Sequence, residues 1–472
     1  MSLIIPANSA AAGGGFTAAN SLMFNYADSA YLNRTLGTPT NNKRWTWSAW
    51  IKRSRITAAV QRIFFAVNGS DEYTTIQFDD EYRLQWFNQI GGATDMQLLT
   101  TREFRDIGAW MHLMFVYDSA NSTAADRQII YVNGVRETVL AQENTAGSNA
   151  DTVINQAVVH NIASGPGAAN FYGGYMSEVV FTDSQALAVT DVGEFDEDSG
   201  IWKPIDVSGL TFGNNGFYLD FEDSSALGND AAGSNNFSLN NLAATDQGTD
   251  TCTNNFATFN SIYKSANQPT YTQGNNTATS SGSGYRLSFS TIAVSTGKWY
   301  AEFKRGAGEM MIGISSLNDA ETLFNVTDYY LGETAKSLGI AYNDGDYIIG
   351  GSQTAYGASY ADGDTLGIAL DLTNKKLYAS KNGAWSNGSG AWSSTTFNAS
   401  TGVIDISGVI PSGEYAYLGC SNTGTSTVSA NFGSPYYAIT SGNTDGDGFG
   451  NFEYEVPSGY FALCTKNLAE YG

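Results

Sequence analysis

The sequence predicts an all-β protein built from two domains, and three observations lead to this prediction. Short apolar segments alternate with polar residues at a period of two along most of the chain, as in strands that bury one face. Turn residues separate these segments: the chain holds 52 glycines but only 8 prolines, and glycine reaches the backbone angles that tight turns need. At 472 residues the chain is also longer than one ordinary domain.

The charge of the chain argues against several classes of partner. The formal net charge is −23, from 46 acidic and 23 basic residues, so most of the surface would repel a phosphate backbone or an anionic membrane. No apolar run approaches the roughly 20 residues of a membrane-spanning helix, and residues 1–6 lack the basic region of a secretory signal. We therefore expect a soluble protein that binds no nucleic acid and does not insert into membranes.

Three cysteines, Cys252, Cys420 and Cys464, are odd in number and widely spaced. This spacing indicates neither a disulfide framework nor a zinc cluster. We expect free, buried thiols, which suits assembly in a reducing cytoplasm.

The first strand signals follow an Ala-, Gly- and Ser-rich N-terminal arm, residues 1–20, which we read either as a disordered terminus or as an arm that docks on a neighbouring subunit. Residues 45–52 alternate so that Trp45, Trp47, Ala49 and Ile51 share one face. An Asn-Gly pair at 133–134 marks a tight hairpin, because both residues tolerate positive φ. Further strands are predicted at residues 62–67, 82–87, 110–118 and 128–132.

These motifs resemble a known domain family. The strand WSAWIK at 47–52, the strand at 110–118, the hairpin IYVNG at 130–134 and the segment FYGGYMSEVVF at 171–181 are similar, in this order, to a LamG-type concanavalin A-like lectin/glucanase domain. The resemblance covers residues 21–183. It implies a sandwich of two antiparallel sheets, which the alternation also favours.

A connecting segment is predicted over residues 184–262. Residues 184–192 are its best helical candidate, and residues 216–221 form a strand that could extend the first sandwich. Its end, residues 250–260, contains the motif TNNFAT at 253–258. This joint resembles one that recurs in virion proteins of marine and environmental bacteriophages.

The second domain is predicted over residues 263–433. The segments GKWYAE at 297–302 and MIGI at 311–314, and the strand pair at 363–383 ending in Asn-Gly, are similar to a SPRY domain. The resemblance implies a bent β-sandwich, jelly-roll-like as the first, whose loops present a face to a protein partner. Residues 434–472 form a C-terminal extension in which residues 445–468 again resemble bacteriophage proteins. No heptads run through the chain, so we expect no coiled-coil fibre shaft.

Exposed aromatic side chains are the candidate glycan-binding residues. Trp86, Trp385 and Trp392 lie near loops rich in Gly, Asn and Ser, where a ring can stack on a sugar face while polar neighbours bind hydroxyl groups. Packing in a core or at its rim is the alternative for each of them.

The sequence predicts no catalytic residue. His112 and His160 are the only histidines, and we expect both to pack among strands rather than to join a catalytic triad. The acidic stretch at 194–198 invites comparison with the paired carboxylates of laminarinases, but it follows the predicted sandwich, so we expect a solvated loop.

Calcium is the one candidate cofactor. Asp445 and Asp447 have the alternating carboxylates of a calcium loop, without the twelfth-position Glu of an EF-hand. LamG-type domains often bind calcium at a rim between sheets, for which Asp71, Asp79 and Asp80 are the candidate ligands. Ordinary turn chemistry is the alternative account of the 445–448 loop.

Taken with the resemblances, the sequence leads to one main functional hypothesis: a non-enzymatic structural protein of a bacteriophage virion. It would be displayed on a tail fibre, appendage or capsid surface, assembled in the host cytoplasm, and used to contact host-surface glycans or proteins. A homotrimer is expected by analogy alone. Two alternatives stay open: a purely structural decoration or connector protein that contacts only other virion proteins, and a polysaccharide-degrading enzyme.

Overall fold

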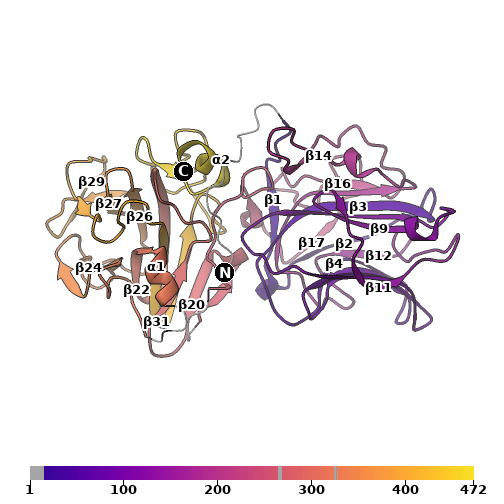
Figure 1. The fold of residues 1–472 in the computed structure, drawn as a ribbon, viewed down its shortest axis with the longest axis horizontal. Coiled ribbons are helices and arrows are strands. Elements are labelled where there is room, and N and C mark those ends of the chain that lie inside the picture. Colours follow the sequence, from indigo (N-terminus) through magenta and orange to yellow (C-terminus); the bar gives the residue numbers. More distant parts are fainter. Residues whose placement is uncertain (1–14, 264–267, 324–325, 327) are drawn as a thin grey trace. The chain divides into compact units, whose positions relative to one another are not determined.

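A computed structural model describes residues 15–263, 268–323, 326 and 328–472, and it confirms an all-β protein (Figure 1). The chain divides into two compact units, and the division falls between Thr253 and Asn254, inside the predicted joint. Each unit has its own hydrophobic core. Within the described residues the only α-helices are α1 (Leu317–Thr322) and α2 (Thr465–Tyr471). Neither of them has the length and hydropathy that a membrane span would need.

The first unit is a sandwich of two eight-stranded antiparallel sheets. One sheet has the order β10-β9-β8-β3-β13-β1-β18, with β16 beside β13, and the other has the order β11-β7-β6-β5-β4-β12-β2-β17. The strands of the first sheet are β1 (Ser21–Phe24), β3 (Arg44–Arg53), β8 (Met111–Asp118), β9 (Gln128–Val132), β10 (Val135–Arg136), β13 (Gly174–Asp183), β16 (Phe217–Leu219) and β18 (Gln247–Gly248). Those of the second are β2 (Tyr31–Thr35), β4 (Gln61–Val67), β5 (Tyr73–Phe78), β6 (Arg83–Ile90), β7 (Ala93–Glu103), β11 (Leu140–Asn144), β12 (Val159–Ile162) and β17 (Ser238–Asn240).

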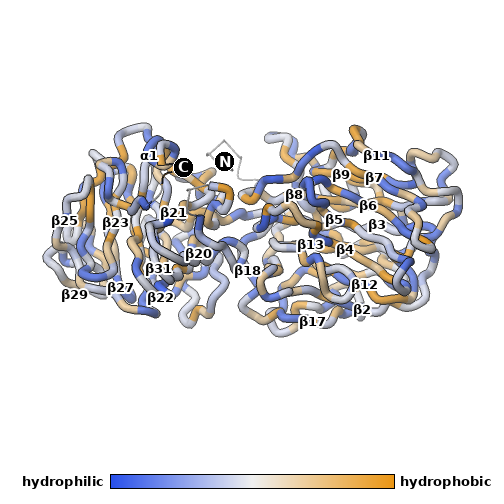
Figure 2. The backbone as a smooth tube through the Cα atoms, turned by 90° about the horizontal axis from the view of Figure 1, so that it is seen from below, coloured by the Kyte–Doolittle hydropathy of each residue, from blue (hydrophilic) through white to orange (hydrophobic). Residues whose placement is uncertain are grey.

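The predicted inward face of β3 lines the core between these sheets. Trp45, Trp47, Ala49 and Ile51 are all fully buried, and the Trp47 ring stacks on Phe64 of the opposite sheet with centroids 6.0 Å apart. Hydrophobic and hydrophilic stretches are interspersed along the backbone of each unit (Figure 2).

The outer face of β3 is also buried, which the alternation did not predict. A segment between β13 and β16 covers the outer side of this sheet with a second hydrophobic cluster that includes Leu187, Val192 and Val207. This segment carries a small hairpin, β14 (Gly193–Phe195) with β15 (Trp202–Pro204).

The predicted connecting segment, residues 184–262, belongs largely to the first sandwich. Strands β16, β17 and β18 pair with β13, β2 and β1, so the first unit extends to Thr253. The predicted strand at 216–221 lies here as β16. The expected helix at 184–192 is only a single 3-10 turn, Val189–Asp191. The other 3-10 turns are Tyr26–Asp28, Ala124–Asp126, Ala244–Asp246 and Gln273–Asn275.

Two long strands organise the second unit. β22 (Lys298–Ser316) pairs along its length with β31 (Ala416–Asn431), and its register shifts twice between Arg305 and Glu309. On its other side, the first half of β22 pairs with β26 and the second half pairs with β23. The sheet therefore bends at the bulge between the two halves. The other strands are β19 (Thr270–Thr272), β20 (Thr277–Ser280), β21 (Arg286–Phe289), β23 (Ser337–Ala341), β24 (Tyr347–Ile349), β25 (Ser352–Thr354), β26 (Thr365–Asp371), β27 (Lys376–Lys381), β28 (Ala384–Ser386), β29 (Trp392–Ser394), β30 (Ile404–Asp405) and β32 (Phe461–Ala462).

The predicted C-terminal extension closes this unit together with the joint. Phe256 of the joint forms a β-bridge with Cys464 of the tail, and the Asn255 and Thr465 backbones bond to each other. Strand β32 runs parallel to β22. The two segments that resemble bacteriophage proteins therefore meet in space, although about 200 residues of sequence separate Phe256 from Cys464.

Candidate ligand-binding site

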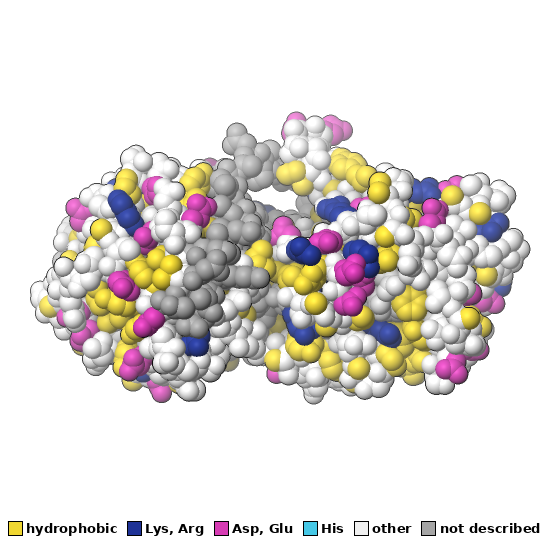
Figure 3. Space-filling view, turned by 60° about the horizontal axis from the view of Figure 1, so that its bottom comes forward, with side chains coloured by type: hydrophobic (Ala, Val, Ile, Leu, Met, Phe, Trp, Pro, Cys, Tyr) yellow, Lys and Arg dark blue, Asp and Glu magenta, His cyan; other side chains and the backbone are white. Residues whose placement is uncertain are grey.

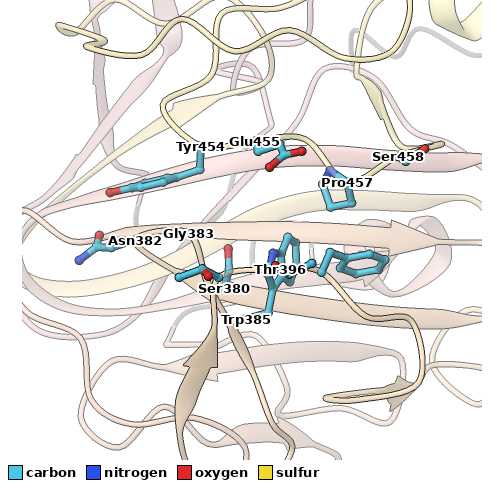
Figure 4. Close-up of a pocket in the computed structure, with 11 residues that line it drawn as sticks. Ser380, Asn382, Gly383, Trp385, Thr396, Tyr454, Glu455, Pro457 and Ser458 are labelled. Carbon is cyan, nitrogen blue, oxygen red and sulfur yellow. The ribbon is translucent and has the colours of Figure 1, made fainter.

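A pocket of about 470 Å³ opens in the second unit beside the predicted glycan-binding residue Trp385. Its volume lies within the roughly 300–1,000 Å³ that is usual for small-molecule sites. In Figure 4, Tyr454, Glu455 and Pro457 face Asn382, Ser380, Trp385 and Thr396 across it. We call it the Trp385 pocket, and its lining residues are Ser380, Asn382, Gly383, Trp385, Thr395, Thr396, Phe397, Tyr454, Glu455, Pro457 and Ser458.

One wall consists of aromatic rings packed edge to face. Trp385 lies on β28, which pairs with β27 through the tight turn at Asn382 and Gly383. Its ring contacts Phe397 with centroids 4.9 Å apart, and Phe397 also packs against Tyr378 and Tyr460. These contacts fix the rings, so the wall is formed before any ligand binds.

The opposite wall is Tyr454, which packs over the turn. Gly383 has φ +77°, and a Cβ placed there would lie 2.7 Å from Cδ1 of Tyr454. Glycine is therefore needed both for the left-handed backbone and for the close approach of the ring. The Asn-Gly signal at 382–383 was visible in the sequence as a turn, but its contact with Tyr454 was not.

Buried Glu302 holds the backbone that carries Tyr454. Its carboxylate accepts hydrogen bonds from the backbone N–H groups of Tyr454 at 2.8 Å and Glu453 at 3.0 Å. The Tyr300 hydroxyl and the Asn431 amide donate to it as well. Burial raises the pKa of Glu302 to about 7, although the backbone hydrogen bonds act in the opposite direction.

The Ser380 hydroxyl also belongs to this pocket. Ser380 is 1% exposed, and its Oγ has no hydrogen-bond partner among the described residues. A buried hydroxyl without a partner costs about 1–3 kcal/mol, so a ligand group that bonds to it would recover that free energy. Glu455 is the one charged residue in the lining, which favours a neutral or cationic ligand over an anionic one.

The three predicted tryptophans have different environments. Trp385 lines the pocket, but it is not the exposed ring that the sequence predicted: it is 7% exposed and packs in a hydrophobic cluster with Tyr378 and Tyr460. Trp392 lies on the neighbouring strand β29 outside the lining, where its Nε1 donates to the Ala358 carbonyl at 2.6 Å and its ring packs on Tyr356. Trp86 is fully buried in the first unit against Trp45. Trp86 therefore cannot stack on a sugar, because the facing sheet covers the whole ring.

The predicted calcium ligands are engaged in turns. Asp445 is buried and accepts four hydrogen bonds, from the Asp447, Phe449 and Ala462 backbones and from the Asn467 amide. Asp447 accepts a bond from the Tyr471 hydroxyl.

The rim candidates of the first unit also lie apart from any such cluster. Asp79 pairs with Arg83, while Asp71 and Asp80 are exposed. In the part of the chain that the structure describes, no three acidic, His or Cys side chains form a group that could hold a metal ion.

The residues weighed for catalysis are separated and structural. His112 and His160 are completely buried, and burial lowers their pKa values to about 3 and about 4. Asp196 of the acidic stretch bonds to Ser199 and Lys203 within its own hairpin.

Another carboxyl with an unusual pKa, Glu178, was not foreseen. It lies at a bulge in β13 with φ 52°, accepts a hydrogen bond from Tyr218, and has its pKa raised by burial to about 8. It does not line the Trp385 pocket. No local sequence pattern marks Glu178, because its burial depends on residues that are distant from it in the sequence.

Comparison with known proteins identifies the domain in the first unit. Residues 25–193 match the family described as the concanavalin A-like lectin/glucanases superfamily. The first unit is thus similar to a concanavalin A-like domain over these residues. This match confirms the resemblance seen in the sequence motifs of residues 21–183, and the superfamily name covers both lectins and glucanases. No curated protein matches the chain.

Solved structures similar to the chain include a pentraxin and two SPRY domains. The native heptameric SAP-like pentraxin from Limulus polyphemus is 15% identical, with 36% of this chain and 79% of that chain covered and a TM-score of 0.28. The SPRY domain of human HERC1 is 14% identical, with 36% and 96% covered and a TM-score of 0.26. A human SPRY domain is 14% identical, with 35% and 94% covered and a TM-score of 0.24.

Proposed function

We propose that this protein is a non-enzymatic binding protein that recognises neutral glycans, with the Trp385 pocket as a binding site. The observation that carries this proposal is the combination of fixed aromatic walls with the buried Ser380 hydroxyl. A pyranose ring presents an apolar face and several hydroxyl groups, which suit those two features. The lectin-containing superfamily matched by residues 25–193 supports a carbohydrate ligand for the protein.

The lining of the pocket supports binding without hydrolysis. Glycosidases generally use two carboxyl groups, about 5–5.5 Å apart in retaining enzymes and roughly 6.5–9.5 Å apart in inverting ones. Glu455 is the single carboxyl group in this lining, and it is exposed. Glu302 lies behind the Tyr454 wall of the pocket, and its carboxylate already accepts hydrogen bonds from four donors.

We further propose that the protein is a bacteriophage virion component, displayed as a homotrimer, that contacts host-surface glycans or proteins during adsorption. The support is the resemblance of residues 250–260 and 445–468 to virion proteins, together with the contact between these segments at Phe256 and Cys464.

Basic side chains are scattered among acidic ones over the described part of the face in Figure 3, and no broad basic surface forms there.

Glycan binding by matched tryptophan variants tests the first proposal. We expect the purified protein to bind neutral glycans on an array, and Trp385→Ala to lose that binding. Trp392→Ala removes a neighbouring tryptophan that does not line the pocket and should bind as the wild type does. Circular dichroism of both variants checks that they fold. Absence of binding by the wild type, or equal loss in both folded variants, would overturn the proposal.

Microscopy of particles tests the virion proposal. Antibody-gold labelling should decorate the outside of intact particles if the protein is displayed. Labelling that appears only after particles are disrupted would favour the purely structural alternative.

A further inference from the structure

A second pocket, of about 290 Å³, opens at one edge of the first sandwich. It lies between β9 and β10 of one sheet and β7 and β11 of the other, and among the described strands β10 and β11 are the last of their sheets on this side. We call it the Gln128 pocket. Its lining residues are Leu98, Ala125, Gln128, Ile129, Ile130, Arg136, Glu137, Thr138, Leu140 and Glu143.

Gln128 gives this pocket one hydrogen-bond donor without a partner. The side chain is 2% exposed, and its Oε1 accepts a bond from the Ala146 backbone N–H at 2.7 Å. That bond fixes which end of the amide faces the backbone, so the other end must be Nε2. No described atom accepts a bond from Nε2, and a buried donor left unpaired costs about 1–3 kcal/mol.

Two charged residues of the lining, Arg136 and Glu137, are already paired. Arg136 donates to the Asp126 carboxylate at 2.7 Å and to the Ala125 carbonyl at 2.6 Å. Glu137 accepts from Arg102 at 3.3 Å. The Arg136 charge is therefore balanced by Asp126 and the Glu137 charge by Arg102, while the exposed Glu143 adds negative charge at the rim. An anionic ligand is disfavoured, although a lone donor would otherwise suit a carboxylate.

Three aliphatic side chains of the lining add an apolar surface. Leu98 and Ile130 are buried parts of the core, and Leu140 packs against it. The pocket thus combines the unpaired Gln128 donor with a small aliphatic surface. An acetamido group is neutral and complements this pocket, because its carbonyl oxygen can accept from the donor while its methyl group contacts the aliphatic surface.

We propose that the Gln128 pocket binds the acetamido group of an N-acetylated hexosamine. The carbonyl oxygen accepts from Gln128 Nε2, and the methyl group contacts Leu98, Ile130 and Leu140. The site lies in the first unit and does not depend on the Trp385 pocket, so it goes beyond the function proposed above.

Isothermal titration of the full chain with N-acetylglucosamine and with glucose tests this proposal. We expect N-acetylglucosamine to bind at least roughly tenfold more tightly, because glucose has neither the acetamido carbonyl that reaches Gln128 Nε2 nor the methyl group that contacts the aliphatic side chains. Gln128→Glu keeps an acceptor for the Ala146 N–H and removes the donor, and it should abolish the preference for the acetamido sugar.

A pair of adjacent substitutions tests the location. Ala125 lines the pocket and Ala124 does not, and both side chains are exposed on the same 3-10 turn. Ala125→Trp should block binding of N-acetylglucosamine, while Ala124→Trp should leave it unchanged. This pair leaves the buried core untouched, so the test does not depend on whether Gln128→Glu folds.

Three results would overturn the proposal: no binding of N-acetylglucosamine, equal affinity for glucose, or wild-type affinity in Ala125→Trp. If Trp385→Ala instead removed all N-acetylglucosamine binding, the acetamido sugar would belong to the Trp385 pocket. If Trp385→Ala lost neutral-glycan binding but still preferred N-acetylglucosamine to glucose, both proposed sites would be supported. The two proposals can therefore fail separately.

Discussion

Lys52 and Asp250 form an ion pair that is completely buried in the first unit. The Lys52 Nζ lies 2.7 Å from Asp250 Oδ2, and the side chains are 0% and 1% exposed. Asp250 also accepts a bond from Trp110 Nε1 at 2.9 Å. This pair attaches the start of the joint to β3, so the segment just before the division between the units is a fixed part of the first sandwich.

Removing one partner of this pair should destabilise the first unit strongly. We expect Asp250→Asn to lower its free energy of unfolding by about 3–5 kcal/mol, because the Lys52 charge would remain buried without its counterion. Denaturant titration of the full chain measures the loss. Asp118→Asn, which breaks the more exposed pair with Arg44, is the control and should cost at most about 1 kcal/mol. Equal losses in the two variants would contradict the prediction.

Glu302 should make the stability of the second unit depend on pH. Its pKa is about 7 in the folded protein against 4.5 as the ordinary value, so the folded state binds the proton more tightly than the unfolded state. The resulting stability is fully present below pH 4.5 and is lost as pH rises through 7, by about 3 kcal/mol in all.

Glu302→Gln cannot titrate, so the variant isolates this contribution. We expect the difference in unfolding free energy between wild type and variant to change between pH 4.5 and pH 7. Hydrogen exchange at the Tyr454 amide, which bonds to Glu302, reports the same change locally. A difference that stays constant over this pH range would show that Glu302 titrates as an ordinary carboxyl group.

Gly383 should support the Trp385 pocket through both its backbone and its lack of a side chain. Gly383→Ala places a methyl group against Tyr454 at a residue with φ +77°. Gly413→Ala is a matched control, since Gly413 has φ +80° with open space around it. The control should lose about 1–2 kcal/mol of stability from backbone strain alone. Gly383→Ala should lose more and should also weaken glycan binding. Equal stability of the two variants, with binding intact, would contradict this role.

Local patterns predicted the parts of the fold that neighbouring residues specify. The period-two pattern of residues 45–52 placed Trp45 and Trp47 in a core, because successive side chains of a strand point to opposite faces. The Asn382-Gly383 pair predicted a tight turn because both residues tolerate positive φ. Trp385 was chosen for its loop-rich surroundings, and it lines a pocket.

The same reasoning failed where distant segments decide the environment. Trp86 has loop-like neighbours in sequence, yet the facing sheet buries it completely. Strands β16, β17 and β18 are two or three residues long and carry little pattern of their own. They pair with strands that lie up to about 230 residues earlier in the chain, such as β18 with β1, so the first unit extends beyond its predicted end.

The sequence by itself determined an all-β chain, two domains divided at the Asn-rich joint, and a resemblance of the first half to concanavalin A-like domains, because alternation, turn residues and family motifs are local properties. Only the tertiary structure decided which side chains form a site. Tyr454 faces Trp385 because Glu302 holds its backbone, and the Gln128 amide lacks a partner because two sheets end beside it. Such arrangements depend on contacts between residues far apart in the chain, and no local pattern records them.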